Sequence, residues 1–372
     1  MRGIERSDAA LRRCAAWVWI AALAACPAVF DADTYSGLGP AKAREIRRAV
    51  ISEMSRLKIP GLTVAIGEDL RLAWVEGFGS ADLESGVSAT PATVYRIASI
   101  SKPITAVAAM QLAEKGKLDL DAPIQRYVPT FPQKPWPVTA RELLSHLSGI
   151  RHYNSLREVD STRHYTDLLA PLKVFAGEPL VFEPGTHFLY STYGYSLLGA
   201  AVEAASGMRF GDCLRENIFT PAHMDHTCID DVYSVIAHRA RGYRRTLDGG
   251  IENCALADDS NKVPGGGFVS TAGDLVRFAA ALERGQLASK QTLALMFTPA
   301  RTTGGRTVPY GLGWMILDRA GRRWVGHSGA QPGVSAYLLA SPSDGFSVAV
   351  LANLEGVDLL ALSARIADIT LQ

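Results

Sequence analysis

The sequence predicts an α/β fold in which an antiparallel sheet, flanked by helices, carries an inserted, mainly helical domain. Three observations support this fold class. Strand-like apolar runs occur near both ends of the chain, helical periodicity dominates between them, and turns containing Gly and Pro separate the C-terminal runs. Of the 372 residues, 48% are apolar and 20% are charged, so the chain can bury one large or two intermediate cores and is too apolar to be disordered.

The first elements of the predicted sheet lie near the N-terminus. An amphipathic pattern at residues 41–58 predicts a helix, and the Pro-Gly pair at 60–61 ends it. Apolar runs at 61–67 and 72–78 predict two strands joined by a tight polar turn. A strand-like run at 95–98 then leads into a further helix. A helix followed by a hairpin is a typical start for an α/β layer.

The middle of the chain is predicted to be mainly helical. Its apolar residues recur with helical spacing, and long loops rich in Gly, Pro and Asp separate the periodic segments. Long loops inside a helical region usually line a site rather than link domains. The expected helices cover residues 104–115, 140–147, 166–175, 191–206 and 271–284.

Apolar residues alternate again near the C-terminus, where a last helix is expected at 357–371. The turn residues between the alternating runs are typical of hairpins and imply antiparallel pairing. The expected strands are 312–317, 323–325, 334–340 and 346–352.

Strands at both ends of the chain indicate one sheet to which both termini contribute. We therefore expect an α/β sheet domain formed by residues 34–105 together with 300–372. Residues 106–299 are expected to form the mainly helical domain inserted into it.

Residues 1–33 are predicted to be an N-terminal leader. Four arginines precede an apolar stretch of about seventeen residues that Pro27 interrupts, which is short for a membrane span and typical of a signal peptide. A Leu-Ala-Ala-Cys sequence resembles a lipobox, in which Cys26 would be acylated, and an uncleaved anchor is a further alternative. A mitochondrial presequence fits less well, because Glu5 and Asp8 are acidic. We expect an exported protein, periplasmic or secreted, with membrane attachment in the lipoprotein or uncleaved form.

Charge and cysteine content exclude several classes of partner. The formal net charge is +1, and acids and bases are interspersed after the leader, so no nucleic-acid partner is indicated. Cys213, Cys228 and Cys254 lack metal-ligand spacing, and burial as apolar side chains is preferred to one disulfide plus a free thiol. His223 and His226 lack a third ligand nearby. We expect no metal and no organic cofactor, and a small molecule or peptide as substrate.

The most informative motif is Ser99-x-x-Lys102 at the predicted start of a helix. A serine and a lysine three residues apart there face the same way, so the amine can take the hydroxyl proton. A second match, Ser55 with Lys58, falls in the last turn of the first predicted helix. The helix dipole favours an alkoxide at a helix start and opposes it at a helix end, which favours Ser99. This pair is the minimum for a nucleophile of acyl transfer.

Five blocks of sequence occur in a fixed order. They are 95–102 (Tyr-Arg-Ile-Ala-Ser-Ile-Ser-Lys), 142–150 (Glu-Leu-Leu-Ser-His-Leu-Ser-Gly-Ile), 188–195 (Phe-Leu-Tyr-Ser-Thr-Tyr-Gly-Tyr), 264–271 (Pro-Gly-Gly-Gly-Phe-Val-Ser-Thr) and 326–330 (Gly-His-Ser-Gly-Ala). In this order the blocks resemble the serine β-lactamase-related hydrolases. That family includes class C β-lactamases, D-Ala-D-Ala carboxypeptidases, D-aminopeptidases, β-lactamase-fold esterases and the mitochondrial β-lactamase-like protein of animals. The resemblance runs from about residue 40 to the C-terminus and implies a β-lactamase/transpeptidase-like fold.

The resemblance implies roles for three catalytic residues. Ser99 matches the nucleophile and Lys102 the residue that activates it. Tyr190 matches the tyrosine that moves protons between nucleophile, lysine and leaving group. A phenol is a poor base at its ordinary pKa of about 10, so this role requires cationic neighbours that favour the phenolate or make the phenol a relay. Lys102 and His327 are the candidates.

The resemblance also implies a substrate-binding strand. His327-Ser328-Gly329 matches the family's third motif, which is Lys-Thr-Gly in many β-lactamases. Gly329 would let the substrate backbone approach the strand, and the N–H groups of Ala330 and Ser99 would form the oxyanion hole.

Two departures from the family pattern affect the expected substrate. Histidine replaces the lysine of the third motif at position 327, which removes a permanent cation that could grasp a β-lactam carboxylate. Thr192 replaces the usual asparagine of Tyr-x-Asn, and the animal mitochondrial relative has a similar Tyr-Ser-Thr. We therefore expect a peptidase or esterase that forms an acyl-enzyme. A β-lactamase proper, and a non-catalytic penicillin-binding or self-assembling protein, are the alternatives.

Other residues are expected to shape the cleft. The three glycines at 265–267 predict a loop with unusual backbone angles, and Ser145 with His146 is interpreted as a capping and packing pair. Further candidates for the pocket wall are Arg151, Asn261 and Lys262.

Overall fold

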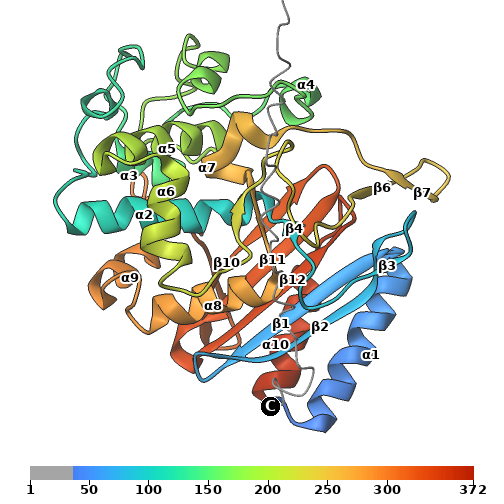
Figure 1. The fold of residues 1–372 in the computed structure, drawn as a ribbon. Coiled ribbons are helices and arrows are strands. Elements are labelled where there is room, and N and C mark those ends of the chain that lie inside the picture. Colours follow the sequence, from blue (N-terminus) through green and yellow to red (C-terminus); the bar gives the residue numbers. More distant parts are fainter. Residues whose placement is uncertain (1–36) are drawn as a thin grey trace, which may run out of the picture. The chain divides into compact units, whose positions relative to one another are not determined.

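The computed structural model describes residues 37–372 and confirms the predicted fold class, an antiparallel sheet flanked by helices with a mainly helical region between its strands (Figure 1). The predicted leader at 1–33, with Cys26, lies outside the described residues, so export and membrane attachment stay predictions. No helix within the described part is long and apolar enough to cross a membrane. The boundaries proposed for the two domains also stay predictions.

The central sheet has seven strands in the order β3-β2-β1-β12-β11-β10-β9, and every neighbouring pair is antiparallel. β1 lies beside β12, with Val64 opposite Val350, so the two ends of the chain meet in the middle of the sheet. This confirms that both termini contribute to one sheet. The strands are β1 (Gly61–Glu68), β2 (Arg71–Asp82), β3 (Val87–Ser88), β9 (Met315–Arg319), β10 (Arg322–Gln331), β11 (Val334–Ser341) and β12 (Phe346–Ala352).

Each face of the central strands contacts its own apolar core. Successive side chains of a strand point to opposite faces, so Val64 joins one core and Ala65 the other. Helices α1 (Pro40–Leu57) and α10 (Leu360–Leu371) pack on the first face, as Figure 1 shows. Helix α8 (Ala272–Glu283) and the mainly helical region pack on the second. The central strands are therefore buried on both sides.

The longest helix of the mainly helical region, α5, begins at a side-chain cap. The Ser191 hydroxyl accepts the N–H of Gly194 at the start of α5, and Gly207, with a φ of 71°, ends that helix in the left-handed region. The helices of this region are α2 (Ser101–Glu114), α3 (Ala140–Leu144), α4 (Leu156–Val159), α5 (Thr192–Ser206), α6 (Phe210–Leu214), α7 (Val263–Gly266) and α9 (Lys290–Met296).

Two small sheets were not predicted, because their strands have only two or three residues and show no periodicity. β8 (Phe268–Ser270) pairs with both β4 (Tyr95–Arg96) and β5 (Cys228–Ile229). β6 (Tyr243–Arg245) and β7 (Ile251–Asn253) form a hairpin. The β4–β8 pair matters for the site, since β4 leads directly into the Ser99 motif.

The predicted helix at 166–175 is wrong. Only Ala170–Val174 is helical, and it forms a 3₁₀ turn. The Asp167 carboxylate accepts the backbone N–H groups of Leu169 and Ala170. Such local bonds offer the backbone an alternative to the α-helix, which apolar periodicity does not report.

The three cysteines of the described residues are free thiols, and no disulfide links them. Cys213 is buried as expected, whereas Cys228 is exposed and Cys254 is half-buried. The expectation of three buried cysteines is therefore wrong for the last two. Cys228 is at the surface because it begins the short edge strand β5.

The packing of α1 makes a testable prediction. Ile46 is fully buried on the face of α1 that contacts the sheet, whereas Ile51 on the same helix is 58% exposed. Ile46→Ala should lower the free energy of unfolding by about 2–5 kcal/mol, because it leaves a cavity. Ile51→Ala should change it by less than about 0.5 kcal/mol. Urea unfolding of both variants measures this, and equal losses would contradict the packing of α1.

Candidate active site

Ser99 lies in a strained turn between β4 and α2. The turn is the 3₁₀ segment Ala98–Ile100, so the serine precedes α2 instead of opening it. Ala98 has a φ of 46°, which is unusual for a residue with a Cβ. The N–H of Ile97 donates to the Phe268 carbonyl of β8 at 3.0 Å. The flanking strands thus hold the backbone in this conformation, and the Ser99 side chain stays partly exposed to a cavity.

Lys102 lies in the first turn of α2 and is fully buried. Its Nζ lies 3.0 Å from Ser99 Oγ, 3.1 Å from Thr192 Oγ1 and 2.7 Å from the Gly265 carbonyl oxygen. Burial, and then the positive charge of Lys262, hold the pKa of Lys102 well below its ordinary value. The predicted Ser–Lys contact is therefore present in the structure.

The three oxygen neighbours of Lys102 suit an uncharged amine. A neutral amine has two N–H donors and one lone pair. Donation to the Gly265 carbonyl and to the Thr192 hydroxyl leaves the lone pair for the proton of Ser99 Oγ. Thr192, which departs from the family pattern, is thus a direct partner of the amine.

Tyr190 borders the same cavity, and Lys102 Nζ lies 4.7 Å from the centre of its ring. Burial raises the pKa of the Tyr190 phenol above its usual value, and a hydrogen bond with Ser99 only partly opposes this. Of the two expected effects of cationic neighbours, the raised pKa speaks against the phenolate and leaves the relay. The phenol is protonated at neutral pH, which makes it a proton donor or relay.

His327 lies on β10 as predicted, but it is not a cation. Its Nδ1 lies 2.6 Å from the Ser328 carbonyl oxygen and its Nε2 lies 3.0 Å from the Tyr310 hydroxyl. Burial, and then Lys102 in its protonated form, lower the pKa of His327 to about 3. The neutral ring donates from Nδ1 and accepts the Tyr310 proton at Nε2, so its lone pair is occupied.

An aromatic cluster that the sequence did not reveal supports Tyr190. The His146 ring centre lies 4.3 Å from that of Tyr190 and 4.7 Å from that of Tyr310. His146 Nδ1 accepts the N–H of Ser191, which fixes the ring. The expected packing role of His146 is thereby described in detail, but its contact with Tyr190 was not predicted. Tyr310 had one signal in the sequence, its position before a Gly-x-Gly turn at 311–313.

Gly329 allows β10 to lie directly against the turn that carries Ser99. A Cβ at Gly329 would come within 2.3 Å of the Ile97 carbonyl oxygen, a backbone atom that cannot move aside. The close approach places Ala330 and Ser99 on the wall of one cavity. The structure therefore brings together Ser99 and Ala330, the two residues whose N–H groups are expected to form the oxyanion hole.

The cavity beside Ser99 has a volume of about 250 Å³, which suits a small acyl group. Lys262 lines it, whereas Arg151 is engaged by Glu158 and Glu178 outside it. Asn261 instead donates to the Glu158 carbonyl. The lining residues are Ser99, His152, Tyr153, Val159, Tyr190, Thr192, Lys262, Gly265, Gly266, Ser328, Ala330 and Gln331.

The three glycines at 265–267 act by their small size. None of them has a positive φ, so the predicted unusual backbone angles are wrong. A Cβ at Gly265 would meet Thr192 Cγ2 at 2.7 Å, and one at Gly267 would meet Val263 Cα at 2.8 Å. The absence of side chains lets this segment approach α5 and offer the Gly265 carbonyl to Lys102.

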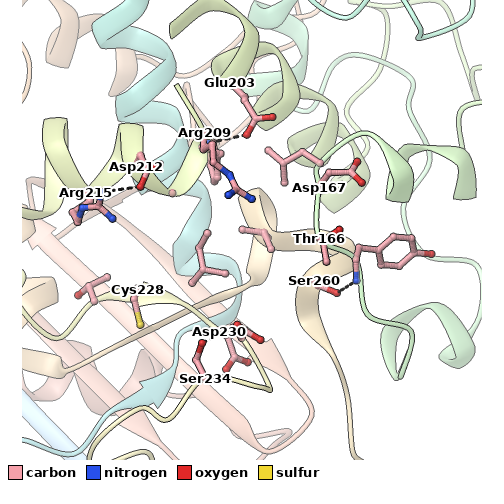
Figure 2. Close-up of a pocket in the computed structure, with 18 of the residues that line it drawn as sticks. Thr166, Asp167, Glu203, Arg209, Asp212, Arg215, Cys228, Asp230, Ser234 and Ser260 are labelled. Atoms are coloured by element: carbon pink, nitrogen blue, oxygen red, sulfur yellow. Dashed lines mark hydrogen bonds and ion pairs between the residues drawn. The ribbon is translucent and has the colours of Figure 1, made fainter. Parts of the chain in front are cut away.

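A larger cavity of about 610 Å³ lies between α6 and the segments 164–168 and 227–236 (Figure 2). None of the predicted catalytic residues lines it. Ser260 and Val263 line this cavity, while Lys262 and Gly265 line the catalytic one, so the segment around α7 contributes to both. Within residues 37–372, no group of three or more His, Cys, Asp or Glu side chains is arranged to hold a metal ion.

The fold and the geometry around Ser99 are those of the class that contains β-lactamases and penicillin-binding proteins. Comparison with known families agrees with this. The family model described as Beta-lactamase matches residues 46–371, and the chain belongs to that family.

Relatives and solved structures support this placement. The chain is 31% identical to the serine beta-lactamase-like protein LACTB, mitochondrial, of Mus musculus, over 88% of this chain and 81% of that protein. It is 32% identical to penicillin-binding protein 4* of Bacillus subtilis, over 74% of this chain and 64% of that protein. D-amino acid amidase from Ochrobactrum anthropi, with L-phenylalanine amide bound, superposes with a TM-score of 0.75 at 25% identity, covering 89% and 97% of the two chains. At the level of the family, these relatives support serine hydrolase chemistry.

The neutral state of His327 predicts acid sensitivity. Its folded pKa of about 3 lies below the ordinary value of about 6.5, so the unfolded chain binds the proton first as pH falls. The contribution of the neutral His327 to the free energy of unfolding should be fully present above about pH 6.5 and should be lost progressively between about pH 6.5 and 3. Chemical denaturation at a series of pH values measures this.

The control variants separate His327 from other groups. In His327→Gln, the free energy of unfolding should decrease less steeply below about pH 6.5 than in the wild-type protein, because the variant lacks the imidazole that the fold keeps uncharged. His187→Gln, at an exposed histidine, should keep the wild-type slope. Identical slopes for wild type and His327→Gln would contradict the neutral imidazole.

Proposed function

We propose that this protein is a serine hydrolase that acts on ester or amide substrates, as a peptidase or esterase, through an acyl-enzyme. The observation that carries the proposal is the 3.0 Å contact between Ser99 Oγ and the buried amine of Lys102. Burial lowers the pKa of Lys102, which favours the neutral amine, and a serine needs such a base to become a nucleophile.

Acylation follows from this contact. Lys102 Nζ takes the proton of Ser99 as Oγ forms a bond to the substrate carbonyl carbon, and the electron pair of the C=O bond moves onto the oxygen. The N–H groups of Ser99 and Ala330 are the donors proposed for that oxyanion. When the tetrahedral intermediate collapses, the bond to the leaving group breaks and the leaving group needs a proton.

Tyr190 is the proposed donor of that proton. Its raised pKa keeps the hydroxyl protonated, and the Lys102 ammonium formed in the first step can replace the proton that it gives up. Lys102 then becomes neutral again and can activate water for deacylation, directly or through Tyr190. His327 is not assigned this step, because its Nε2 faces the Tyr310 hydroxyl.

The preference for simple esters and amides rests on the two departures from the family pattern. An uncharged His327 offers no permanent cation at the third-motif position on β10 to a β-lactam carboxylate, and Thr192 offers Lys102 a hydroxyl where an amide is usual. The similarity to D-amino acid amidase supports small amides as candidates. A β-lactamase, and a penicillin-binding or self-assembling protein without turnover, remain the competing functions.

The nucleophile is tested by covalent labelling. A fluorophosphonate probe should label the wild-type protein, and Ser99→Ala should abolish the label. Ser55→Ala is the matched control, since Ser55 belongs to the other Ser-x-x-Lys match, is exposed in the last turn of α1, and should label normally. Mass spectrometry of the intact protein gives the stoichiometry.

Substrate turnover then separates the competing functions. Rates are compared for 4-nitrophenyl esters, D-alanyl peptides and nitrocefin. Folded protein that gives no adduct with any probe would exclude the enzyme, and dominant nitrocefin turnover would favour the β-lactamase.

The base is tested by the pH dependence of kcat/KM. Lys102 accepts a proton only when neutral, so activity should fall as pH falls through its folded pKa and level off above it. Because that pKa is lowered, the plateau should begin well below the ordinary lysine value of about 10.4. Lys102→Met should lose at least about 100-fold at every pH. Activity that keeps rising to pH 10.4 would contradict an uncharged Lys102.

A further inference from the structure

Lys262 is a buried cation on the wall of the catalytic cavity. It is 2% exposed, and it lines the cavity together with Ser99. Its Nζ donates to the Val159 carbonyl at 2.7 Å, forms an ion pair with Asp259 Oδ1 at 3.0 Å, and lies 5.5 Å from the centre of the Tyr153 ring. The Val159 carbonyl uses one of the three N–H groups of an ammonium, which leaves N–H groups for another acceptor.

The surroundings of Lys262 carry an excess of positive charge. Asp259 lies between Lys262 and Arg96, with Arg96 Nε at 3.5 Å. Arg96 also pairs with Asp230 at 2.7 Å, and Arg239 pairs with Asp230 at 2.5 Å. Three cations therefore share two buried carboxylates, which leaves these five groups a formal charge of +1 before the more exposed carboxylate of Asp231, near Arg239, is counted. An anion placed beside these groups would find a favourable potential.

Asp259 fixes the position of the ammonium. Its side chain is fully buried, and its Oδ2 accepts from Gln331 Nε2 at 2.6 Å. Gln331 ends β10 and lines the catalytic cavity too. Lys262 is thus tied to the same strand that carries Ala330, so its charge is held in a constant place relative to the reacting carbonyl.

The catalytic cavity itself contains no competing anion. Of the described residues that line it, none is an aspartate or a glutamate. The larger cavity of Figure 2 differs in this respect, because five carboxylate residues line it. They are Asp167, Glu203, Asp212, Asp230 and Asp231.

We propose that Lys262 binds a carboxylate of the substrate, so that the enzyme prefers acyl donors that carry a negative charge. This inference rests on the proposed hydrolase function. The position that holds the cation in many β-lactamases, the third-motif residue on β10, is here the neutral His327. The chain instead carries its substrate-facing cation on the segment that leads into α7.

Two esters of equal length test the proposal. They are 4-nitrophenyl hydrogen adipate, whose acyl chain ends in a carboxylate, and 4-nitrophenyl hexanoate, whose acyl chain is neutral. For each ester, kcat/KM is divided by the uncatalysed rate constant, and the ratio of the two values is the measured preference. The wild-type protein should prefer the adipate by at least about tenfold, mainly through a lower KM, as expected for a charge-assisted hydrogen bond.

Variants at position 262 assign the preference to the ammonium. Lys262→Met should reduce the ratio to about one, and Lys262→Arg should retain most of it. Loss of the Lys262 charge also changes the pKa of Lys102. This change affects the turnover of both esters equally, so it cancels in the ratio of their rates. Lys134→Met, which removes a lysine bound to the Ala176 and Glu178 carbonyls outside the cavity, should keep the wild-type ratio.

The outcomes separate the inference from the function. A wild-type ratio of one or less, with good turnover of the hexanoate, would overturn the anion site and leave the hydrolase intact. A preference that survives Lys262→Met would also overturn it. Absence of turnover and of Ser99 labelling would instead overturn both proposals together. If Lys262→Met does not fold, the wild-type ratio and Lys262→Arg still decide the question.

Discussion

The burial of the Lys102 amine is the constraint on which the rest of the site depends. Burial beside two hydroxyls and one carbonyl lowers the pKa of the amine well below its ordinary value, and this favours the uncharged form that acts as a base. Its partners come from three separate segments: the turn before α2, the start of α5 and the segment of α7. The positions of these three segments determine the site, because each segment places one oxygen beside the Lys102 amine nitrogen.

The same constraint explains the chemistry of the neighbouring side chains. A second cation close to Lys102 would compete with its proton, and His327 is accordingly neutral and bonded to Tyr310. The phenol of Tyr190 is kept protonated by the same burial. Lys262 is the exception, and the ion pair with Asp259 holds its charge in a fixed position. The site thus contains one buried amine base, one proton relay and one fixed cation.

The fold was largely predictable from the sequence, whereas the proton states of the site were not. Strand periodicity and turn residues located β1 and β12, and motif order brought Ser99, Lys102 and Tyr190 together. The charge of His327 depends first on burial and then on Lys102, and its Nε2 contacts Tyr310, seventeen residues away. The residues next to His327 in the sequence reveal none of these. The helix expected at 166–175 failed for the opposite reason, because the local bonds of Asp167 overrode the apolar pattern.

The left-handed conformation of Ala98 has a consequence for how the enzyme is made. An alanine rarely adopts it unaided, so the turn needs the bond from Ile97 to Phe268 and the contact with Gly329. Both supports lie far downstream, and β1 pairs with β12, the last strand of the chain. During synthesis the nucleophile is therefore assembled late. A chain that is still growing carries Ser99 and Lys102 but no organised site, and so it is protected from premature acylation.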